Sequence, residues 1–228
     1  MRKVLAILCL ACTTVIVAQN RPYIDDKMFH FGFSLGINMM HYSVTPSLME
    51  FDGEIYQARV SSLLPGFSVG LIGDMRLSRH LNLRFCPTLH FGNRTLTYKT
   101  ESGSVSKLRT DVLSLPITIP LYLKWSAERE INYRPYLIAG GGMAYDFGID
   151  KERKILQKPI DVFLEVGAGC DFYFEWFKLC PQITYQIGFL NILTPVEKRP
   201  ELQQRDFFYT QSISRLLQRQ INITFNFE

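Results

Sequence analysis

Apolar and polar residues alternate along much of this chain with a period of two. Between His30 and Met39 every odd position is apolar, and every even position is His, Gly, Ser or Asn. Such alternation is typical of a β-strand that has one apolar and one polar face. The pattern returns along the chain, with exceptions in some segments, and predicts eight strands of about ten residues. These lie at residues 30–39, 67–77, 81–91, 113–121, 136–147, 162–174, 183–189 and 221–228.

The connections between these segments differ in length in a regular way. Residues 78–80 and 175–176 are short connections and residues 126–133 an intermediate one, whereas residues 43–66, 93–110, 148–160 and 191–212 form longer ones. Short turns in the periplasm and longer loops outside the cell are typical of outer-membrane barrels. A soluble lipocalin-like barrel would show the same alternation.

The polar phase of the strands separates these two possibilities. It contains mainly Gly, Ser, Thr, Asn, Gln and charged residues, which suit a narrow polar lumen, so we assign the apolar phase to lipid. Beyond residue 18 no apolar run is long enough for a transmembrane helix. The expected fold is therefore all-β: an eight-stranded antiparallel up-and-down transmembrane β-barrel of the outer membrane.

Proline is the main objection to this fold. Pro116 and Pro120 lie in the fourth predicted strand, and Pro87 and Pro181 lie in two others. Each removes one backbone donor from a sheet, and a closed barrel has no edge strand that could accommodate it. We expect local bulges at these positions, and the boundaries around Pro116 and Pro120 are the least defined.

The first residues of the chain have the layout of an export signal. Arg2 and Lys3 precede an apolar run, Val4–Ala18, which ends in a small residue. This predicts a secretory signal peptide at residues 1–18, followed by a single barrel domain at residues 19–228 with a short periplasmic lead. A lipoprotein signal with Cys12 as the lipidated residue is the alternative, although the residues before Cys12 fit it poorly. The predicted location is the outer membrane.

Composition limits the partners of this protein. The chain has 228 residues and a net charge of +4, which falls to +2 without residues 1–18. The basic residues form no run, so nucleic acid is not expected. No Cys-x-x-Cys or His-x-x-x-His spacing suggests a metal site, and we expect no cofactor and no small-molecule substrate. The partner that the fold itself predicts is outer-membrane lipid.

Charged residues gather on the inward phase of the predicted strands. All but one of them lie near the short turns, which places them toward the periplasmic mouth, and Glu165 is the exception. One interpretation is a structural network of ion pairs that fills the lumen, because buried charges must be paired. The other is a docking surface for a periplasmic partner. The candidate residues are Asp74, Arg76, Arg84, Lys124, Glu165, Asp171 and Lys178.

Three cysteines and one histidine remain to be weighed. Strand phase places Cys86 and Cys180 inward on opposite sides of the barrel and Cys170 toward lipid, so we expect three unpaired thiols. His90 and Ser68 point inward near the outer rim, where some small barrels modify lipid. No acid is placed beside them by sequence spacing, so hydrogen-bonded filler is the favoured interpretation and the protein is not expected to be an enzyme.

Three stretches carry a resemblance to a known family, and the resemblance spans essentially all of the chain after residue 18. They are RPYIDDKMFHFGFSLGINMMHYSV from Arg21, LPGFSVGLIGDMRLSRHLNLRFCPTLHFG from Leu64 and LSLPITIPLYLKW from Leu113. They are similar to the PorT family of Bacteroidetes outer-membrane proteins, whose gliding-motility relatives are called SprT. The resemblance implies a component of the type IX secretion system, required to export proteins that carry a C-terminal signal. It supplies no catalytic residues.

The size of the predicted barrel restricts this role. An eight-stranded barrel is filled by its own side chains, so folded cargo cannot pass through it. An accessory role is therefore expected, with other secretion proteins contacted through the outer loops, the lead at residues 19–27 or the lipid-facing wall. Among the loops, residues 150–154 (DKERK) are the most charged. A generic structural or adhesive barrel and a lipid-modifying enzyme are the two alternatives.

Overall fold

The computed structural model describes residues 27–47, 50–51, 54–60, 64–100, 108–148, 156–195 and 210–228. The predicted signal peptide and the charged loop at residues 150–154 lie outside these ranges. The strands are β1 (Phe29–Pro46), β2 (Glu50–Phe51), β3 (Glu54–Val60), β4 (Leu64–Arg76), β5 (Leu81–Phe85), β6 (Thr88–Thr100), β7 (Leu108–Ser114), β8 (Pro116–Ser126), β9 (Tyr133–Asp146), β10 (Ile160–Tyr173), β11 (Lys178–Gly188) and β12 (Ile213–Phe227).

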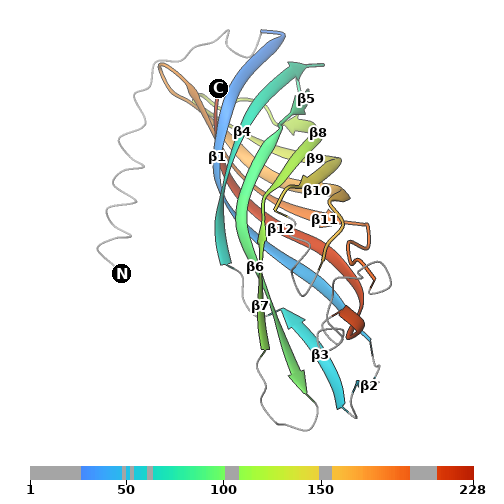
Figure 1. Ribbon diagram of the computed structural model, residues 1–228. Coiled ribbons are helices and arrows are strands. Elements are labelled where there is room, and N and C mark those ends of the chain that lie inside the picture. Colours follow the sequence, from blue (N-terminus) through green and yellow to red (C-terminus); the bar gives the residue numbers. More distant parts are fainter. Residues whose placement is uncertain are drawn as a thin grey trace, which may run out of the picture.

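Ten of these strands form one closed antiparallel ring of eight positions (Figure 1). Two positions of the ring are each occupied by two consecutive strands. β5 and β6 share the third position, and β7 and β8 share the fourth. The ring closes between the first and last strands, where β1 pairs with β12 from Phe33–Phe227 to Pro46–Ile213. The eight-stranded up-and-down barrel predicted from the sequence is thus confirmed.

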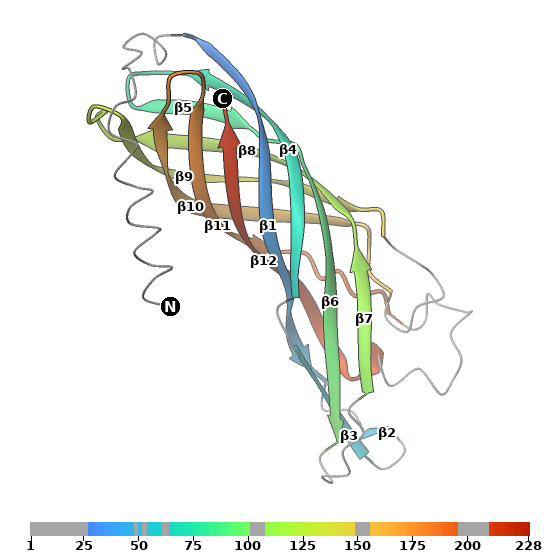
Figure 2. The same cartoon turned by 90° about the vertical axis from the view of Figure 1, so that its left-hand side faces the viewer.

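The strands extend beyond the segments that alternation predicts. β1 has 18 residues and β12 has 15, and β12 begins eight residues before the predicted start at residue 221. At the end of the ring remote from the last residue, β6 and β7 project past the rim together with β3 (Figure 2). Strand pairing needs only backbone groups. It therefore continues beyond the alternating segments, where neither face of the strand has to be apolar. No helix in the described part of the chain is long and apolar enough to cross a membrane.

The prolines lie at interruptions of the ladders rather than at the bulges that we expected. Pro87 separates β5 from β6, and its carbonyl oxygen accepts a hydrogen bond from the Leu71 N–H at 3.0 Å. Pro120 lies opposite this break. On one side of it in β8, Thr118 pairs with β6, and on the other side Leu121 pairs with β5. One interruption of the wall therefore accommodates two prolines.

The other two prolines that the sequence analysis singled out, Pro116 and Pro181, follow the same rule. Pro116 comes directly after Leu115, the residue that separates β7 from β8. Pro181 lies in β11 within a gap of the ladder to β10, between the pairs Gly169–Gln182 and Phe172–Leu179. In each case the missing N–H falls where the neighbouring strand makes no regular pair.

Side chains alternate between lipid and lumen as the phase predicts. Along β8, Leu121, Leu123 and Trp125 are half exposed on the outer wall, whereas the intervening Tyr122 and Lys124 are buried in the lumen. An apolar outer wall and a polar interior are the arrangement of a barrel in a bilayer.

Glycines in β9 and β10 make room for two large side chains in the lumen. A Cβ at Gly140 would lie 2.1 Å from the Leu121 carbonyl oxygen and 2.8 Å from the side chain of Tyr122. A Cβ at Gly169 would lie 2.5 Å from the hydroxyl end of Tyr136. Two of the glycines that blur the alternation in these strands, Gly140 and Gly169, therefore lie where tyrosines fill the barrel.

Candidate functional site

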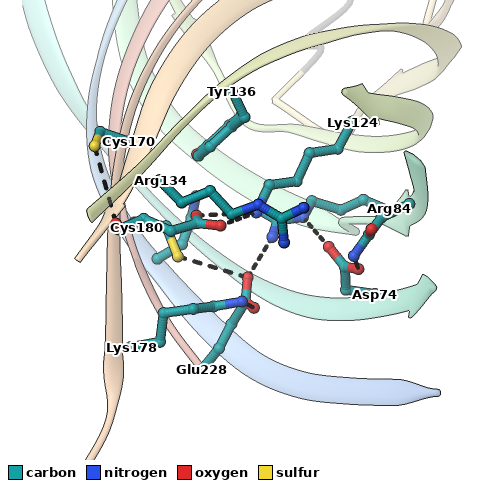
Figure 3. A network of polar contacts seen from close by, with 12 residues as sticks. Asp74, Arg84, Lys124, Arg134, Tyr136, Cys170, Lys178, Cys180 and Glu228 are labelled. Carbon is teal, nitrogen blue, oxygen red and sulfur yellow. Dashed lines mark hydrogen bonds and ion pairs between the residues drawn. The ribbon is translucent and has the colours of Figure 1, made fainter. Parts of the chain in front are cut away.

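Charged side chains from six neighbouring segments meet inside the ring at the end that carries the short turns (Figure 3). We call them the periplasmic cluster, because short turns of outer-membrane barrels lie in the periplasm. Its side chains are at most 5% exposed. The cluster consists of Asp74 on β4, Arg84 on β5, Lys124 on β8, Asp171 on β10, Lys178 on β11 and Glu228, which follows β12.

Arg84 and Glu228 link the two sides of this cluster. Arg84 Nε donates to Asp74 Oδ2 at 2.7 Å, and its guanidinium also pairs with Glu228 Oε1. Lys178 Nζ lies 2.5 Å from Glu228 Oε2. The backbones of Lys178 and Glu228 also pair, with the Lys178 N–H donating to the Glu228 carbonyl oxygen at 2.7 Å. Glu228 therefore connects the first half of the ring to the last.

The remaining pair lies against an aromatic ring. Lys124 Nζ donates to both carboxylate oxygens of Asp171, at 2.9 and 2.6 Å, and lies 4.1 Å from the ring centroid of Tyr136. The guanidinium of Arg84 is 5.8 Å from the same centroid. Tyr136 thus packs between the two cationic groups and contributes a cation–π interaction to each.

The structure brings together five of the seven candidate residues and adds one that the sequence analysis missed. Arg76 is half-buried and forms none of these pairs, and Glu165 lies apart. Glu228 takes their place, so three cations face three anions. The sequence pattern could have identified Glu228, because the alternation of residues 221–228 places even positions inward.

Burial of the periplasmic cluster favours the structural interpretation over a docking surface. Its carboxylates and cations already pair with one another, and almost none of their surface reaches solvent. A partner could contact these groups only by breaking ion pairs in a low-dielectric interior, which costs several kcal/mol for each exposed charge.

Glu165 lies deeper in the lumen, among neutral donors. Its Oε2 accepts from the Tyr122 hydroxyl at 2.7 Å, and its Oε1 accepts from the Thr184 hydroxyl and from the Asn222 amide, the latter at 3.1 Å. These groups line a cavity of about 30 Å³. Because one water molecule occupies about 30 Å³ of the liquid, the cavity has room for only one or two.

His90, the candidate base, binds only neutral groups in the described structure. Its Nδ1 accepts from the Gln220 amide at 3.0 Å, which leaves Nε2 to donate to the Thr118 hydroxyl at 3.0 Å. Ser68 is buried, and its hydroxyl makes no hydrogen bond to His90. This arrangement gives the ring a fixed place in the polar lumen but no carboxylate to orient it as a base.

Cys86, Cys170 and Cys180 are free thiols. Their predicted phases agree with the structure, and Cys86 and Cys180 come from strands on opposite sides of the eight-position ring, as predicted. Both pack against one cluster that contains Tyr122 and Tyr136. The lumen is narrow enough for side chains from distant strands to share the same neighbours.

The outer end of the lumen holds a buried cation with neutral partners. Arg94 is 1% exposed, and its guanidinium donates to Gln157 Oε1 at 3.4 Å and to Gln218 Oε1 at 3.3 Å. It also lies 5.1 Å from the ring centroid of Tyr42. Among the described residues, no carboxylate lies within ion-pair distance of Arg94.

The two acids near this end bind backbone groups instead. Asp146 Oδ1 accepts from the N–H groups of Leu115 and Gly148, both at 2.9 Å. Asp161 Oδ1 accepts from the N–H of Val162 at 2.8 Å and of Leu190 at 3.1 Å. These carboxylates therefore hold the starts of loops rather than a cation.

Two outer segments close the barrel above Arg94. The Lys158 N–H donates to the Ile192 carbonyl oxygen at 2.7 Å, and the Ile192 N–H donates to the Leu216 carbonyl oxygen at 3.1 Å. Ile192 and Leu216 are fully buried. Across the described ranges, no group of three or more His, Cys, Asp or Glu residues could hold a metal ion.

Known proteins similar to this chain include a solved structure and a family of outer-membrane domains. A solid-state NMR structure of the outer membrane protein AlkL in DMPC lipid bilayers is 11% identical, covers 92% of this chain and 93% of its own, and has a TM-score of 0.39. No curated protein matches the chain. The family model described as "Outer membrane protein beta-barrel domain" matches residues 17–194, more than three quarters of the sequence. The chain therefore belongs to the outer membrane protein β-barrel domain family.

Proposed function

We propose that this barrel is a non-enzymatic accessory component of the type IX secretion system. Its role would be to support the export of proteins that carry a C-terminal signal. The proposal rests on the resemblance of the stretches from Arg21, Leu64 and Leu113 to the PorT family. It also rests on a lumen that is filled by side chains. In this proposal the protein acts through its surfaces, because its interior is occupied.

The filled lumen is the observation that carries the accessory role. At the periplasmic end, Arg84, Lys124 and Lys178 pair with carboxylates across the whole ring. In the middle, the cavity beside Glu165 has a volume of only about 30 Å³. At the outer end, Arg94 and the segments around Ile192 occupy the opening. A folded cargo protein would need a much wider pore, which another component must provide.

A clean deletion tests the proposal. We expect the deletion strain to lose surface-exposed cargo with a C-terminal signal, to accumulate that cargo in the periplasm, and to keep lipid A of normal mass. Complementation by the wild-type gene should restore secretion. Unchanged secretion would refute the proposal and favour the generic structural or adhesive barrel.

The lipid-modifying alternative gives a different result. It predicts a change in lipid A mass on deletion and requires a catalytic base. His90→Gln keeps a hydrogen-bonding side chain in the lumen but removes that base. If His90→Gln reproduced an altered lipid A mass while the barrel stayed folded, the enzyme would replace the accessory role.

A further inference from the structure

An open groove crosses the lipid-facing wall of the barrel. It has a volume of about 850 Å³ and an almost entirely apolar lining, and it extends over β8 to β12, which lie side by side (Figure 2). One row of cross-strand pairs follows the groove through five strands, which is roughly 19 Å at about 4.8 Å per strand. The residues of this row are Leu123, Ala139, Val166, Tyr185 and Ile221.

Small side chains form the floor of the groove. Ala139 lies between Leu123 and Val166, which are 50% and 42% exposed, and Ala168 lies between two larger apolar neighbours in the same way. A hollow that stays empty loses dispersion contacts, so a group of matching shape gains them by filling it. Because this wall faces lipid, the group available to fill the hollow is an acyl chain.

The groove slants from the outer side of the wall toward the periplasmic side. Leu123 lies three residues before Ser126, where β8 ends, whereas Ile221 lies six residues before Phe227, where β12 ends. Both strands end at the periplasmic side of the ring, so the groove reaches furthest outward at Ile221. An acyl chain in the groove therefore has its headgroup near β12.

A cation and an imidazole lie beside this outer end of the groove. Arg219 is two residues from Ile221 on the same face of β12, roughly 7 Å along the strand, and His41 of β1 is its direct cross-strand partner. Arg219 Nη1 and His41 Nδ1 are buried without a hydrogen-bond partner. Within the described ranges no carboxylate pairs with Arg219, and its positive charge acts on the His41 ring. An anion between the two side chains would supply the missing partner for both.

These two side chains lie at the level where the apolar wall ends. The outward-facing positions of residues 29–39 in β1 are apolar, and the next such position is His41. The outward-facing positions of residues 221–227 in β12 are apolar as well, and the next one is Arg219. A charged side chain on the lipid face costs least at the membrane interface. Arg219 and His41 therefore lie at the level of the headgroups of the outer leaflet.

We propose that the groove and the Arg219–His41 pair together bind one phosphorylated lipid of the outer leaflet. An acyl chain lies over Ala139, and the headgroup phosphate lies between Arg219 and His41. A guanidinium can donate two parallel N–H bonds to phosphate oxygens, and cationic side chains at this depth recognise lipid headgroups. The phosphate distinguishes this lipid from the hydrocarbon that contacts the rest of the wall. The site is independent of the proposed role in secretion.

Charge substitutions test the headgroup end of the site. In native mass spectrometry the purified wild-type barrel should retain one molecule of lipid A, at least about fivefold more than lipid A from which the phosphates have been removed. Arg219→Gln should lower the retention of lipid A at least about fivefold, whereas Arg219→Lys keeps the charge and should stay within about threefold. Arg79→Gln removes an exposed cation at the periplasmic end and, as the matched control, should change retention less than about twofold.

Substitutions on the wall test the groove. Ala139→Phe fills the floor and should lower lipid A retention at least about threefold. Val69→Phe enlarges an exposed side chain of β4 away from the groove and should leave retention within about twofold. All variants are compared at equal amounts of folded barrel, measured by heat-modifiable migration. Photocrosslinking from position 139 in cells should yield an adduct with a phosphorylated lipid.

Several results would overturn the inference. Equal retention of lipid A with and without its phosphates would leave only ordinary contact with the bilayer. An equal loss in Arg79→Gln would assign the effect to net charge, and unchanged retention by Ala139→Phe would remove the groove from the site. Displacement of lipid A by inorganic phosphate alone would identify a site for a free anion. A crosslinked adduct with protein and not with lipid would show that another protein covers this wall.

Discussion

The two ends of the lumen are closed by different chemistry. At the periplasmic end, three cations pair with three carboxylates from six segments of the ring. At the outer end, Arg94 is equally buried but rests on two glutamine side chains and one tyrosine ring. The nearby Asp146 and Asp161 bind backbone N–H groups instead of a cation.

This difference indicates which interactions stabilise each end of the lumen. Arg84 and Glu228 are 144 residues apart in the sequence, and their ion pair joins β5 to the end of β12. The periplasmic cluster is therefore complete only when the ring is closed. The outer end depends more on backbone hydrogen bonds between loops, such as that from Lys158 to Ile192. Removal of a single charge should accordingly affect the two ends unequally.

The largest effects are expected where one charge of the periplasmic cluster is removed alone, as in Glu228→Gln. This substitution leaves Arg84 and Lys178 buried without their shared carboxylate, and breaking a buried pair in this way costs about 3–5 kcal/mol. Urea unfolding in lipid vesicles, followed by tryptophan fluorescence, should report this loss of unfolding free energy. Glu130→Gln, in an exposed turn, is the matched control and should change it by less than about 0.5 kcal/mol. An equal, small effect of both substitutions would contradict the role of the cluster.

Arg94→Met at the outer end should have a smaller effect. It removes two long hydrogen bonds to glutamine and a cation–π contact, but it also removes a buried charge that has no anionic partner among the described residues. We expect a loss of about 1–2 kcal/mol, because the two glutamine oxygens are left unpaired. The same unfolding assay measures it. A loss as large as that of Glu228→Gln would mean that the two ends do not differ.

The double substitution Lys124→Met with Asp171→Leu should cost less than either single change. Removing both charges leaves no unpaired ion, and apolar replacement of a buried pair is often neutral or stabilising. We expect a change within about 1 kcal/mol for the double variant and about 3–5 kcal/mol for each single variant. A double-mutant cycle measures this coupling. Additive losses would show that Lys124 and Asp171 stabilise the barrel independently of each other.

The smallest effect is expected on ion conductance. The wild-type barrel should form no open channel in planar bilayers, and Arg94→Met should not open one, because the periplasmic cluster still closes the other end. Stable single-channel currents from the wild type would contradict a filled lumen. Currents from Arg94→Met alone would show instead that the outer end is the barrier.

Much of the fold could be predicted from the sequence because strand geometry is local. Successive side chains of a strand face opposite sides, so the alternation from Phe31 to Met39 assigns each residue to lipid or lumen before any partner is known. The same rule placed Lys124 and Asp171 inward, and both are buried there. It failed to predict how the chain accommodates Pro87 and Pro120, because that depends on two strands sharing one interruption.

The candidate site was predictable only as a set of inward charges near the short turns. The alternation of a strand cannot predict which of these charged side chains are in contact, because the register between strands determines how deep each one lies in the lumen. Arg76 was therefore grouped with residues that it does not pair with, and Glu228 was overlooked although its phase points inward. The left-handed backbone of Ile131 in the turn between β8 and β9, with φ of 49°, could not be predicted from the alternation, because turn geometry depends on how the two strands enter the turn.

The sequence by itself determined the number of positions in the ring, the face of each strand residue and the polar character of the interior. These follow from a period of two and from the need to pair every backbone group within a membrane. Only the tertiary structure decided that three cations and three anions balance at one end, that Arg94 rests on neutral groups at the other, and that Cys86 and Cys180 share one cluster. The physical reason is closure of the ring, which brings together side chains that are far apart in the chain.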